Sequence, residues 1–122
     1  GFSVPGKFIV SYSAIAQNRE SYFSIETITE SDVIQFSFLE LMNMAQKAIE
    51  WFPFLFKLLQ SVYIMKEMRE KSFLLENASV RYVNFLKEFP GLEDKIRQYH
   101  IASFLGITPE ALCRIKKDLK LM

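Results

Sequence analysis

Cysteine and histidine are nearly absent from this 122-residue chain, which contains one of each. A disulfide or a cysteine-ligated cluster needs more than one cysteine, so Cys113 excludes both within one chain. His100 has no second histidine, cysteine or carboxylate at ligand spacing, which favours a solvent-facing helix residue over a metal ligand or a catalytic group. We therefore expect no cofactor, and a single cysteine is compatible with a reducing cytoplasm.

Long apolar runs are missing as well. No stretch approaches the ~20 apolar residues that cross a bilayer, and the opening GFSVPGK lacks the pattern of a signal peptide. The chain also shows no nucleophile–base pair, metal constellation or phosphate-binding loop. We therefore expect a cytoplasmic protein without membrane contact and without enzymatic activity.

Charge is nearly balanced overall but unevenly distributed along the chain. The formal net charge is +1. Residues 1–50 carry three basic and six acidic side chains, whereas residues 95–122 carry six basic and two acidic ones. Half of the residues are hydrophobic, which is enough to build a packed core. A basic C-terminal end on a folded chain is what phosphate binding requires.

Residues 98–117, QYHIASFLGITPEALCRIKK, predict a helix-turn-helix. Ala102 is small where the two helices would cross, and Gly106 suits the left-handed backbone that ends the first helix. Thr108 is expected to cap the second helix, with Pro109 at its first position. The apolar residues expected on the inner faces and in the turn are Ile101, Leu105, Ile107, Leu112 and Ile115.

The outward face of the second helix carries groups that can meet base edges and phosphates. These residues are Thr108, Pro109, Glu110, Cys113, Arg114 and Lys117. Gln98 and Tyr99 open the first helix with groups suited to a phosphate oxygen. A plain core hairpin would show similar apolar positions, but the small residue, the glycine and the outward cations together favour binding to double-stranded DNA.

A long helix is predicted from Pro53 to Leu75, because neither glycine nor proline interrupts this stretch. Apolar side chains recur in it at heptad spacing, at Leu55, Leu58, Val62 and Met65, and the stripe fades toward Arg69. The helix could pack inside its own monomer. Its length of about 34 Å at 1.5 Å per residue instead favours a homodimer seam made by these five residues.

Shorter elements are predicted on either side of this helix. Ser37 and Glu40 match a capping box for a helix that ends near Ile49. Residues 22–29 alternate apolar and polar side chains, and residues 33–36 form a second β-rich run, so we expect two neighbouring strands of a larger sheet. A turn is expected at Pro5-Gly6 and a polar loop over residues 13–21. After the long helix, Ser79 should cap a further helix with Val83, Leu86 and Phe89 facing inward.

The order of these parts resembles the Crp/Fnr family of bacterial transcription regulators. The resemblance is carried by Gly6-Lys7-Phe8-Ile9, the capped helix at Ser37, the long helix from Pro53, and IASFLGITPEALCRIKKDL. It is closest to the short cyclic-nucleotide-binding-domain regulators typical of Bacteroidetes, in which a segment like Phe89-Pro90-Gly91 precedes the helix-turn-helix. Only the later part of the family's sensory β-roll is represented, and the chain does not begin with Met, so we expect N-terminal truncation.

The resemblance implies roles for residues at both ends of the chain. It assigns base contacts to Pro109, Glu110 and Arg114, of which Arg114 is the candidate for a bidentate contact to guanine. It places an effector cassette over residues 6–22. There Ser11 occupies the position of the family's ribose-binding Glu, and the phosphate-binding Arg falls at or near Ser21, with Arg19 displaced. An unidentified effector would therefore use Gly6, Ser11, Arg19 and Ser21, and a response to cyclic AMP is not expected.

Together these observations predict an α+β chain that is mostly helical. We expect a partial β-roll over residues 1–50, a long dimerisation helix over 51–76 and a helix-turn-helix DNA-binding domain over 77–122. The predicted function is sequence-specific DNA binding by a Crp/Fnr-type transcription regulator. The alternative is a ligand-binding or protein-interaction module whose helix-turn-helix does not read DNA.

Overall fold

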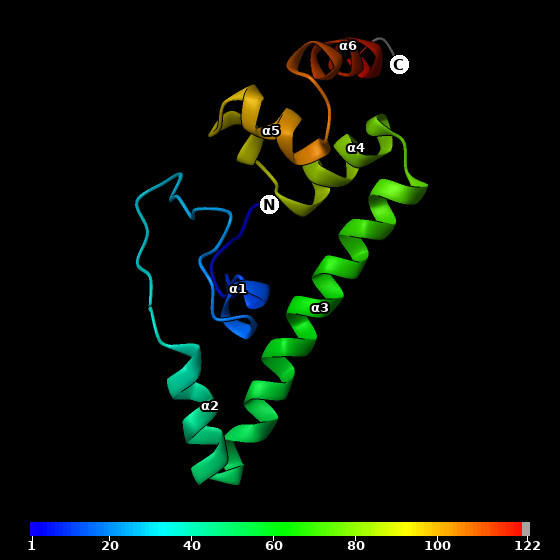
Figure 1. The fold of residues 1–122 in the computed structure, drawn as a ribbon. Helices are drawn as coiled ribbons and strands as arrows, with labels where there is room; N and C mark the ends of the chain where they lie inside the picture. Colours follow the sequence, from blue (N-terminus) through cyan, green and yellow to red (C-terminus); the bar gives the residue numbers. More distant parts are fainter. Residues whose placement is uncertain (121–122) are drawn as a thin grey trace. The chain divides into compact units, whose positions relative to one another are not determined.

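Every regular element of the chain is a helix in the computed structural model, which describes residues 1–120 (Figure 1). In chain order the elements are α1 (Tyr12–Ala16), α2 (Phe38–Lys47), η1 (Ile49–Trp51), α3 (Phe52–Leu75), α4 (Ala78–Glu88), η2 (Leu92–Asp94), α5 (Gln98–Leu105) and α6 (Pro109–Lys120). None of the helices within residues 1–120 is both long and apolar enough to cross a membrane.

The predicted partial β-roll is wrong, because residues 1–120 contain no strand. Residues 22–29 and 33–36, which alternate as strands would, have no regular secondary structure. Their apolar side chains remain exposed, to 92% in the case of Ile34. A strand needs the hydrogen bonds of a neighbouring strand, and alternation along one segment does not supply them. The fold class is therefore all-helical rather than α+β.

The first twenty residues agree with the sequence only in part. The turn at Pro5-Gly6 is confirmed, with Gly6 at a φ of 80°. The polar loop expected over residues 13–21 is wrong at its start, because α1 occupies Tyr12–Ala16 and buries Ala14. With five residues, α1 is too short to show a helical period in the sequence.

The chain divides into two compact units. The N-terminal unit is Ser3–Glu67, and the C-terminal unit is Met68–Met122 together with Gly1–Phe2. The boundary between them falls inside α3, so the last two turns of this helix belong to the C-terminal unit.

In the N-terminal unit, α2 packs against the beginning of α3. The Ser37 hydroxyl accepts a hydrogen bond from the Glu40 amide at 3.3 Å, which confirms the predicted cap. The helix ends at Lys47, close to the predicted end. Buried side chains from the two helices form the core of this unit, and they are Leu41, Leu55 and Leu58.

The predicted long helix is confirmed as α3, which runs from Phe52 to Leu75 with Pro53 in its first turn. Proline is tolerated there because amides in the first turn have no helical acceptor. Within α3, Leu55, Leu58 and Val62 are buried by the chain itself. Met65 is 56% exposed, so the predicted apolar stripe divides into a covered first part and an open second part.

The core of the C-terminal unit is built by α4, α5 and α6. Its buried members are Tyr82, Phe85, Phe89, Ile101, Ala102, Leu105 and Leu112. Phe2 also packs here, with its ring stacked on that of Phe104 at a centroid distance of 5.0 Å. Among residues 1–120, no residue of α3 belongs to this core or to its partly buried rim.

The start of α4 differs from the prediction. The N-cap is Asn77, whose side-chain oxygen accepts a hydrogen bond from the Val80 amide at 2.9 Å. The prediction placed the cap at Ser79, which lies inside the first turn instead. Asparagine and serine are similar in their preference for this position, so the residue type alone does not distinguish them.

The inward face of α4 is also displaced by one position. Tyr82 and Phe85 are buried, whereas the predicted Val83 is half-buried and the predicted Leu86 is exposed. Phe89 is buried as predicted. Phe85 is drawn inward because the rings of Phe2 and Phe104 lie against it, at 6.0 and 5.6 Å, and neither residue is near α4 in the sequence. The inward face is therefore decided by partners from outside the helix.

Candidate nucleic-acid interface

The turn between α5 and α6 has the predicted geometry. Gly106 adopts the left-handed conformation with a φ of 69° and ends α5. Its amide donates to the Ser103 carbonyl at 3.2 Å, and the Ile107 amide donates to the Ala102 carbonyl at 3.0 Å. These bonds satisfy carbonyls that the last turn of a helix leaves without partners. The chain is thus free to change direction before α6.

The beginning of α6 is also as predicted. The Thr108 hydroxyl accepts a hydrogen bond from the Ala111 amide at 3.1 Å, and Pro109 is the first helical residue. Glu110 lies in the first turn, where the positive end of the helix dipole favours a carboxylate. A capped first turn with a favourable charge gives α6, the helix predicted to contact DNA, a well-defined start.

The two helices meet through the side chains that the sequence placed inside. Ile101, Ala102, Leu105 and Leu112 are at most 1% exposed, and Ile107 and Ile115 are half-buried. The small Ala102 side chain allows the helices to approach closely. The predicted inner faces of α5 and α6 are confirmed.

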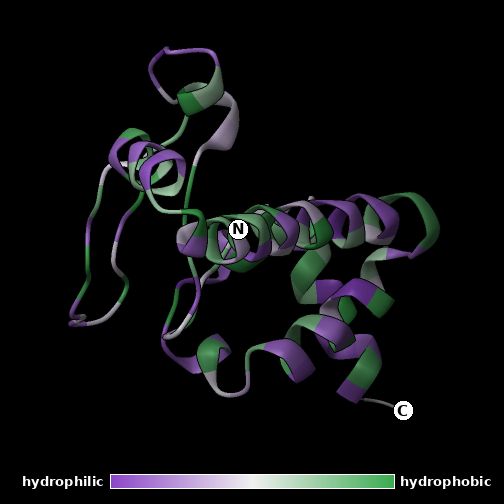
Figure 2. Ribbon diagram, turned by 90° about the horizontal axis from the view of Figure 1, so that it is seen from below, coloured by the Kyte–Doolittle hydropathy of each residue, from purple (hydrophilic) through white to green (hydrophobic). Residues whose placement is uncertain are grey.

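The opposite face of α6 is open to solvent. All six residues predicted to face outward are exposed: Thr108, Pro109, Glu110, Cys113, Arg114 and Lys117. Figure 2 shows both hydrophilic and hydrophobic residues on α6, the helix next to the label C, as an amphipathic helix requires. Within residues 1–120, Arg114 and Lys117 form no ion pair or side-chain hydrogen bond, so their charges are available for phosphates or bases.

Gln98 and Tyr99 lie at the first two positions of α5 and are exposed, as is the following His100. Arg97 precedes the helix and makes no side-chain cap. The first amides of α5 therefore have no side-chain acceptor, and such amides favour anionic groups. This arrangement is compatible with the predicted phosphate contact by Gln98 and Tyr99.

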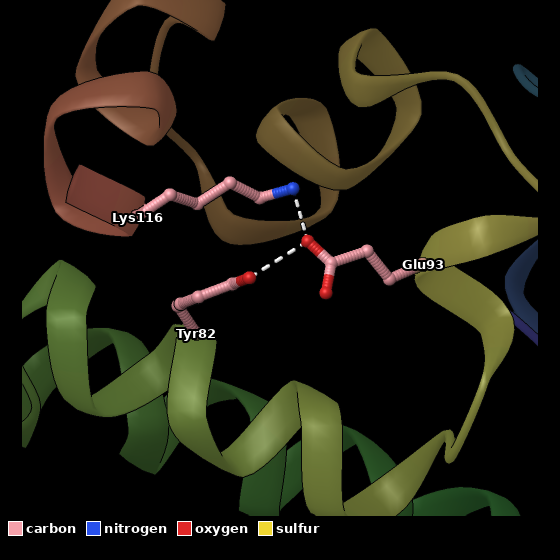
Figure 3. A network of polar contacts seen from close by, with 3 residues as sticks. All are labelled: Tyr82, Glu93 and Lys116. Carbon is pink, nitrogen blue, oxygen red and sulfur yellow. Dashed lines mark hydrogen bonds and ion pairs between the residues drawn. The ribbon is translucent and has the colours of Figure 1, made fainter. Parts of the chain in front are cut away.

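A polar network that the sequence did not reveal holds α6 against α4 and η2. Figure 3 shows that Tyr82, Glu93 and Lys116 converge on one carboxylate oxygen. The Tyr82 hydroxyl donates to Glu93 Oε1 at 2.7 Å, and Lys116 forms an ion pair with the same oxygen. Lys116 follows the buried Leu112 by four residues, which puts both on one helix face. That spacing is the signal that distinguishes Lys116 from the outward Lys117.

The network changes the protonation behaviour of its members. Burial raises the pKa of the Glu93 carboxyl, but hydrogen bonds from Lys116 and Tyr82 and the charges of Lys116 and Lys120 outweigh burial, and the net pKa lies below its ordinary value. Burial raises the pKa of the Tyr82 phenol, and the hydrogen bond to Glu93 and the carboxylate's charge raise it further. Glu93 is thus held as an anion and Tyr82 as a neutral donor.

The residues predicted to bind an effector lie around α1. Gly6 is in the turn before this helix and Ser11 is its N-cap, whereas Arg19 and Ser21 are exposed beyond its end. Among residues 1–120, the Ser11 hydroxyl oxygen is buried without a hydrogen-bond partner, and the Ser21 hydroxyl accepts from the Phe23 amide at 3.2 Å. No hydrogen bond within these residues joins any two of the four.

The residues assigned to a dimer seam have different environments. Leu55 and Leu58 pack in the core with α2, Val62 is buried, and Met65 is exposed. Arg69 is half-buried and donates a hydrogen bond to the Phe104 carbonyl at 2.8 Å. Of the five, Met65 is therefore the one with an open apolar side chain.

No protein family, curated protein or solved structure matches the chain significantly. Residues 1–120 also contain no group of three or more His, Cys, Asp or Glu side chains that could hold a metal ion.

Proposed function

We propose that this chain belongs to a sequence-specific DNA-binding transcription regulator of the Crp/Fnr type, acting as a cytoplasmic homodimer that does not respond to cyclic AMP. The observation that carries the proposal is the division of α6 into two faces. Leu112 on its inner face is 0% exposed, whereas Arg114 and Lys117 on its outer face are exposed and form no ion pair among residues 1–120. A cationic helix face held by a rigid core is suited to a major groove.

Arg114 and Lys117 contribute differently to this proposal. The guanidinium of Arg114 can donate two hydrogen bonds to one guanine, which discriminates between bases. The ammonium of Lys117 acts as a point charge and neutralises a phosphate in any sequence. Sequence preference should therefore depend on Arg114, and general affinity on Lys117.

The homodimer is proposed to form through α3, with a seam different from the stripe read in the sequence. Leu55, Leu58 and Val62 are used within the chain. The open apolar face of α3 instead carries Ile64, Met65, Met68 and Leu75, which are between 46% and 75% exposed. Met65, Met68 and Leu75 follow a spacing of three and seven residues, which fits a helix–helix seam. Two copies joined here could present two copies of α6 to adjacent half-sites.

The proposal is tested by selecting bound fragments from a random-sequence duplex pool with the purified protein. We expect enrichment of one motif built from two inverted half-sites, because a two-fold dimer imposes that symmetry on its DNA. Arg114→Ala protein provides the control and should lose the enrichment. A pool that stays random after several rounds at low salt would contradict DNA reading.

A second candidate is a protein-interaction module whose helix-turn-helix does not read DNA. It is favoured by the apolar side chains exposed along residues 22–36, including Ile25, Val33 and Ile34. Exposed apolar surface of this extent marks contact with other protein. This candidate predicts no motif in the selection and an unchanged affinity for DNA after Arg114→Ala.

A further inference from the structure

The C-terminal end of α5 receives two arginine side chains from outside the helix-turn-helix. Arg69 Nη2 donates to the Phe104 carbonyl at 2.8 Å. Arg81 donates to the Leu105 carbonyl from Nε at 3.2 Å and from Nη2 at 3.1 Å. These carbonyls lie in the last turn of α5, where helical partners are missing and the helix dipole favours positive charge.

Both guanidinium groups lie over the ring of Phe73. The Cζ atom of Arg69 is 4.9 Å from the Phe73 ring centroid and that of Arg81 is 5.0 Å from it. Arg69 also lies 4.3 Å from the centroid of Phe104. An aromatic face attracts a cation, so the ring allows two like charges to meet at one helix end. Burial lowers the pKa of Arg69, while the charge of Glu88 raises it and that of Arg81 lowers it.

These residues connect the end of α3 with the turn of the helix-turn-helix. Arg69 and Phe73 are four residues apart on α3 and so share one face of it. Arg81, from α4, also donates to the Glu76 carbonyl just after α3. The Phe73 ring approaches Gly106 so closely that a Cβ there would lie 2.7 Å from Phe73 Cε1.

One further polar link joins the end of α3 to α4: the Glu76 carboxylate accepts from the Ser72 hydroxyl at 2.5 Å and from the Asn84 side-chain amide at 3.2 Å. Within residues 1–120, the buried core of that unit and its rim come from α4, η2, α5, α6 and the segments next to them, and from Phe2, without any residue of α3. The apolar core therefore fixes α4, α5 and α6 to one another. Within the C-terminal unit, the last two turns of α3 are held to these helices by the arginine contacts, by Phe73 and by this Glu76 link.

We propose that Arg69, Phe73 and Arg81 are positioning residues that set the orientation of α6 relative to the end of α3, and thereby the DNA half-site spacing that a dimer accepts. The half-site part of this inference rests on the proposed DNA binding. Polar bonds to two adjacent carbonyls and an aromatic contact at the turn resist rotation about the short Glu76-Asn77 link. Loss of the guanidinium groups would leave α6 intact but free to tilt.

The orientation can be measured without DNA. Cys113 is the single cysteine, is exposed on α6 and accepts a spin label, and Glu70→Cys adds a second label on an exposed position of α3 away from the proposed seam. With labelled protein diluted in unlabelled protein, electron–electron resonance should give one narrow distance distribution. We expect Arg69→Gln with Arg81→Gln to widen it at least twofold. Lys87→Gln, an exposed change on α4, should leave it unchanged.

An equally narrow distribution in the folded double variant would overturn the inference. If the double variant does not fold, as judged by circular dichroism, Arg69→Gln alone is used, because Arg81 still holds the Leu105 carbonyl. Arg69→Lys keeps the positive charge but loses the planar guanidinium with its several donors. It should restore part of the narrow distance distribution. A loss of packing alone would not be repaired by this conservative change.

The DNA arm uses the selected duplex with its half-site spacing changed by one and two base pairs. Each base pair shifts a half-site by about 3.4 Å along the helix, so wild-type affinity should fall on the order of tenfold per mismatch in spacing. The double variant should bind the duplex with the best spacing more weakly than wild type. Its affinity should fall by only about threefold or less when the spacing changes. Identical losses of affinity in the wild type and the double variant would show that other residues set the spacing. If wild type binds no motif, the proposed function fails, and the spin-label distances still decide the positioning role.

Discussion

Gly106 lies directly against the ring of Phe73, so that a Cβ on Gly106 would stand 2.7 Å from Phe73 Cε1. The glycine is therefore required for two reasons at once. Its φ of 69° disfavours other residues, and the aromatic ring leaves no room for a side chain. The end of α3 and the turn of the helix-turn-helix are joined at this contact.

Gly106→Ala should destabilise the protein more than Gly91→Ala. Both glycines have left-handed φ values, 69° and 76°, but a Cβ at Gly91 meets nothing within 4 Å. Backbone strain alone predicts a loss of about 1–2 kcal/mol at Gly91, and the clash with Phe73 adds roughly 1–3 kcal/mol at Gly106. Urea unfolding measures the difference.

Phe73→Ala provides the control for this comparison. Combined with Gly106→Ala, it should restore part of the free energy of unfolding that Gly106→Ala removes, because the clash with the ring is gone. Equal losses for Gly106→Ala and Gly91→Ala would contradict the close contact. Strictly additive effects of Phe73→Ala and Gly106→Ala would contradict it as well.

Arg114→Ala should weaken binding to the selected motif by about 1–3 kcal/mol, with little change on random DNA. Lys117→Ala should weaken binding to both and lower the slope of log affinity against log salt by about one. Fluorescence anisotropy over a salt series measures both effects. If Arg114→Ala lost equal affinity for the two duplexes, base reading by this residue would be refuted.

Glu93→Gln should remove part of the acid sensitivity of the fold. The folded pKa of Glu93 lies below its ordinary value of 4.5, so its ionised form stabilises the protein above that pH. This contribution is lost as the pH falls from about 4.5 through the lower folded value. The free energy of unfolding of Glu93→Gln should therefore be about 1 kcal/mol lower at neutral pH and should fall less steeply in acid.

Glu70→Gln is the matched control for this pH series, because Glu70 is exposed, lies outside the first turn of its helix and forms no ion pair among residues 1–120. The free energy of unfolding of this variant should fall in acid as steeply as that of the wild type. A curve for Glu93→Gln that runs parallel to the wild-type curve below pH 4.5 would argue against the network of Tyr82, Glu93 and Lys116 as a source of stability.

Met65→Glu with Met68→Glu should dissociate the proposed homodimer. Two carboxylates in an apolar seam lose hydration without gaining partners, and the dissociation constant should rise on the order of 100-fold. Sedimentation equilibrium measures this change. Tyr63→Glu is the control, since Tyr63 is 67% exposed on another face of α3. A dimer that survives the double change but not Tyr63→Glu would place the seam on that other face.

Local features of the helix-turn-helix were predictable from the sequence. Gly106, Thr108 and Pro109 act within one turn of their own positions, through a left-handed residue, a side-chain cap and a missing amide. The long α3 was predictable for a similar reason, because residues 54–75 contain no helix breaker. Signals of this kind need no partner from elsewhere in the chain.

Features that depend on distant partners were predicted wrongly or were not predicted at all. Residues 22–29 alternate like a strand, but within residues 1–120 no other strand pairs with them. Arg69 fits the spacing of an apolar seam, but its guanidinium is bonded to the Phe104 carbonyl. Lys116 and Lys117 are alike as residue types, and only Lys116 meets Glu93.

By itself, the sequence determined where the helices of the C-terminal half lie and which face of α6 is polar, because caps, glycines and helical periods act between neighbouring residues. Only the tertiary structure decided that Phe2 joins the aromatic core, that α4 turns Tyr82 and Phe85 inward, and that Arg69 and Arg81 hold the end of α5. The two arginines reach carbonyls 35 and 24 residues away along the chain. Contacts over such separations depend on how the elements pack, and no local pattern encodes them.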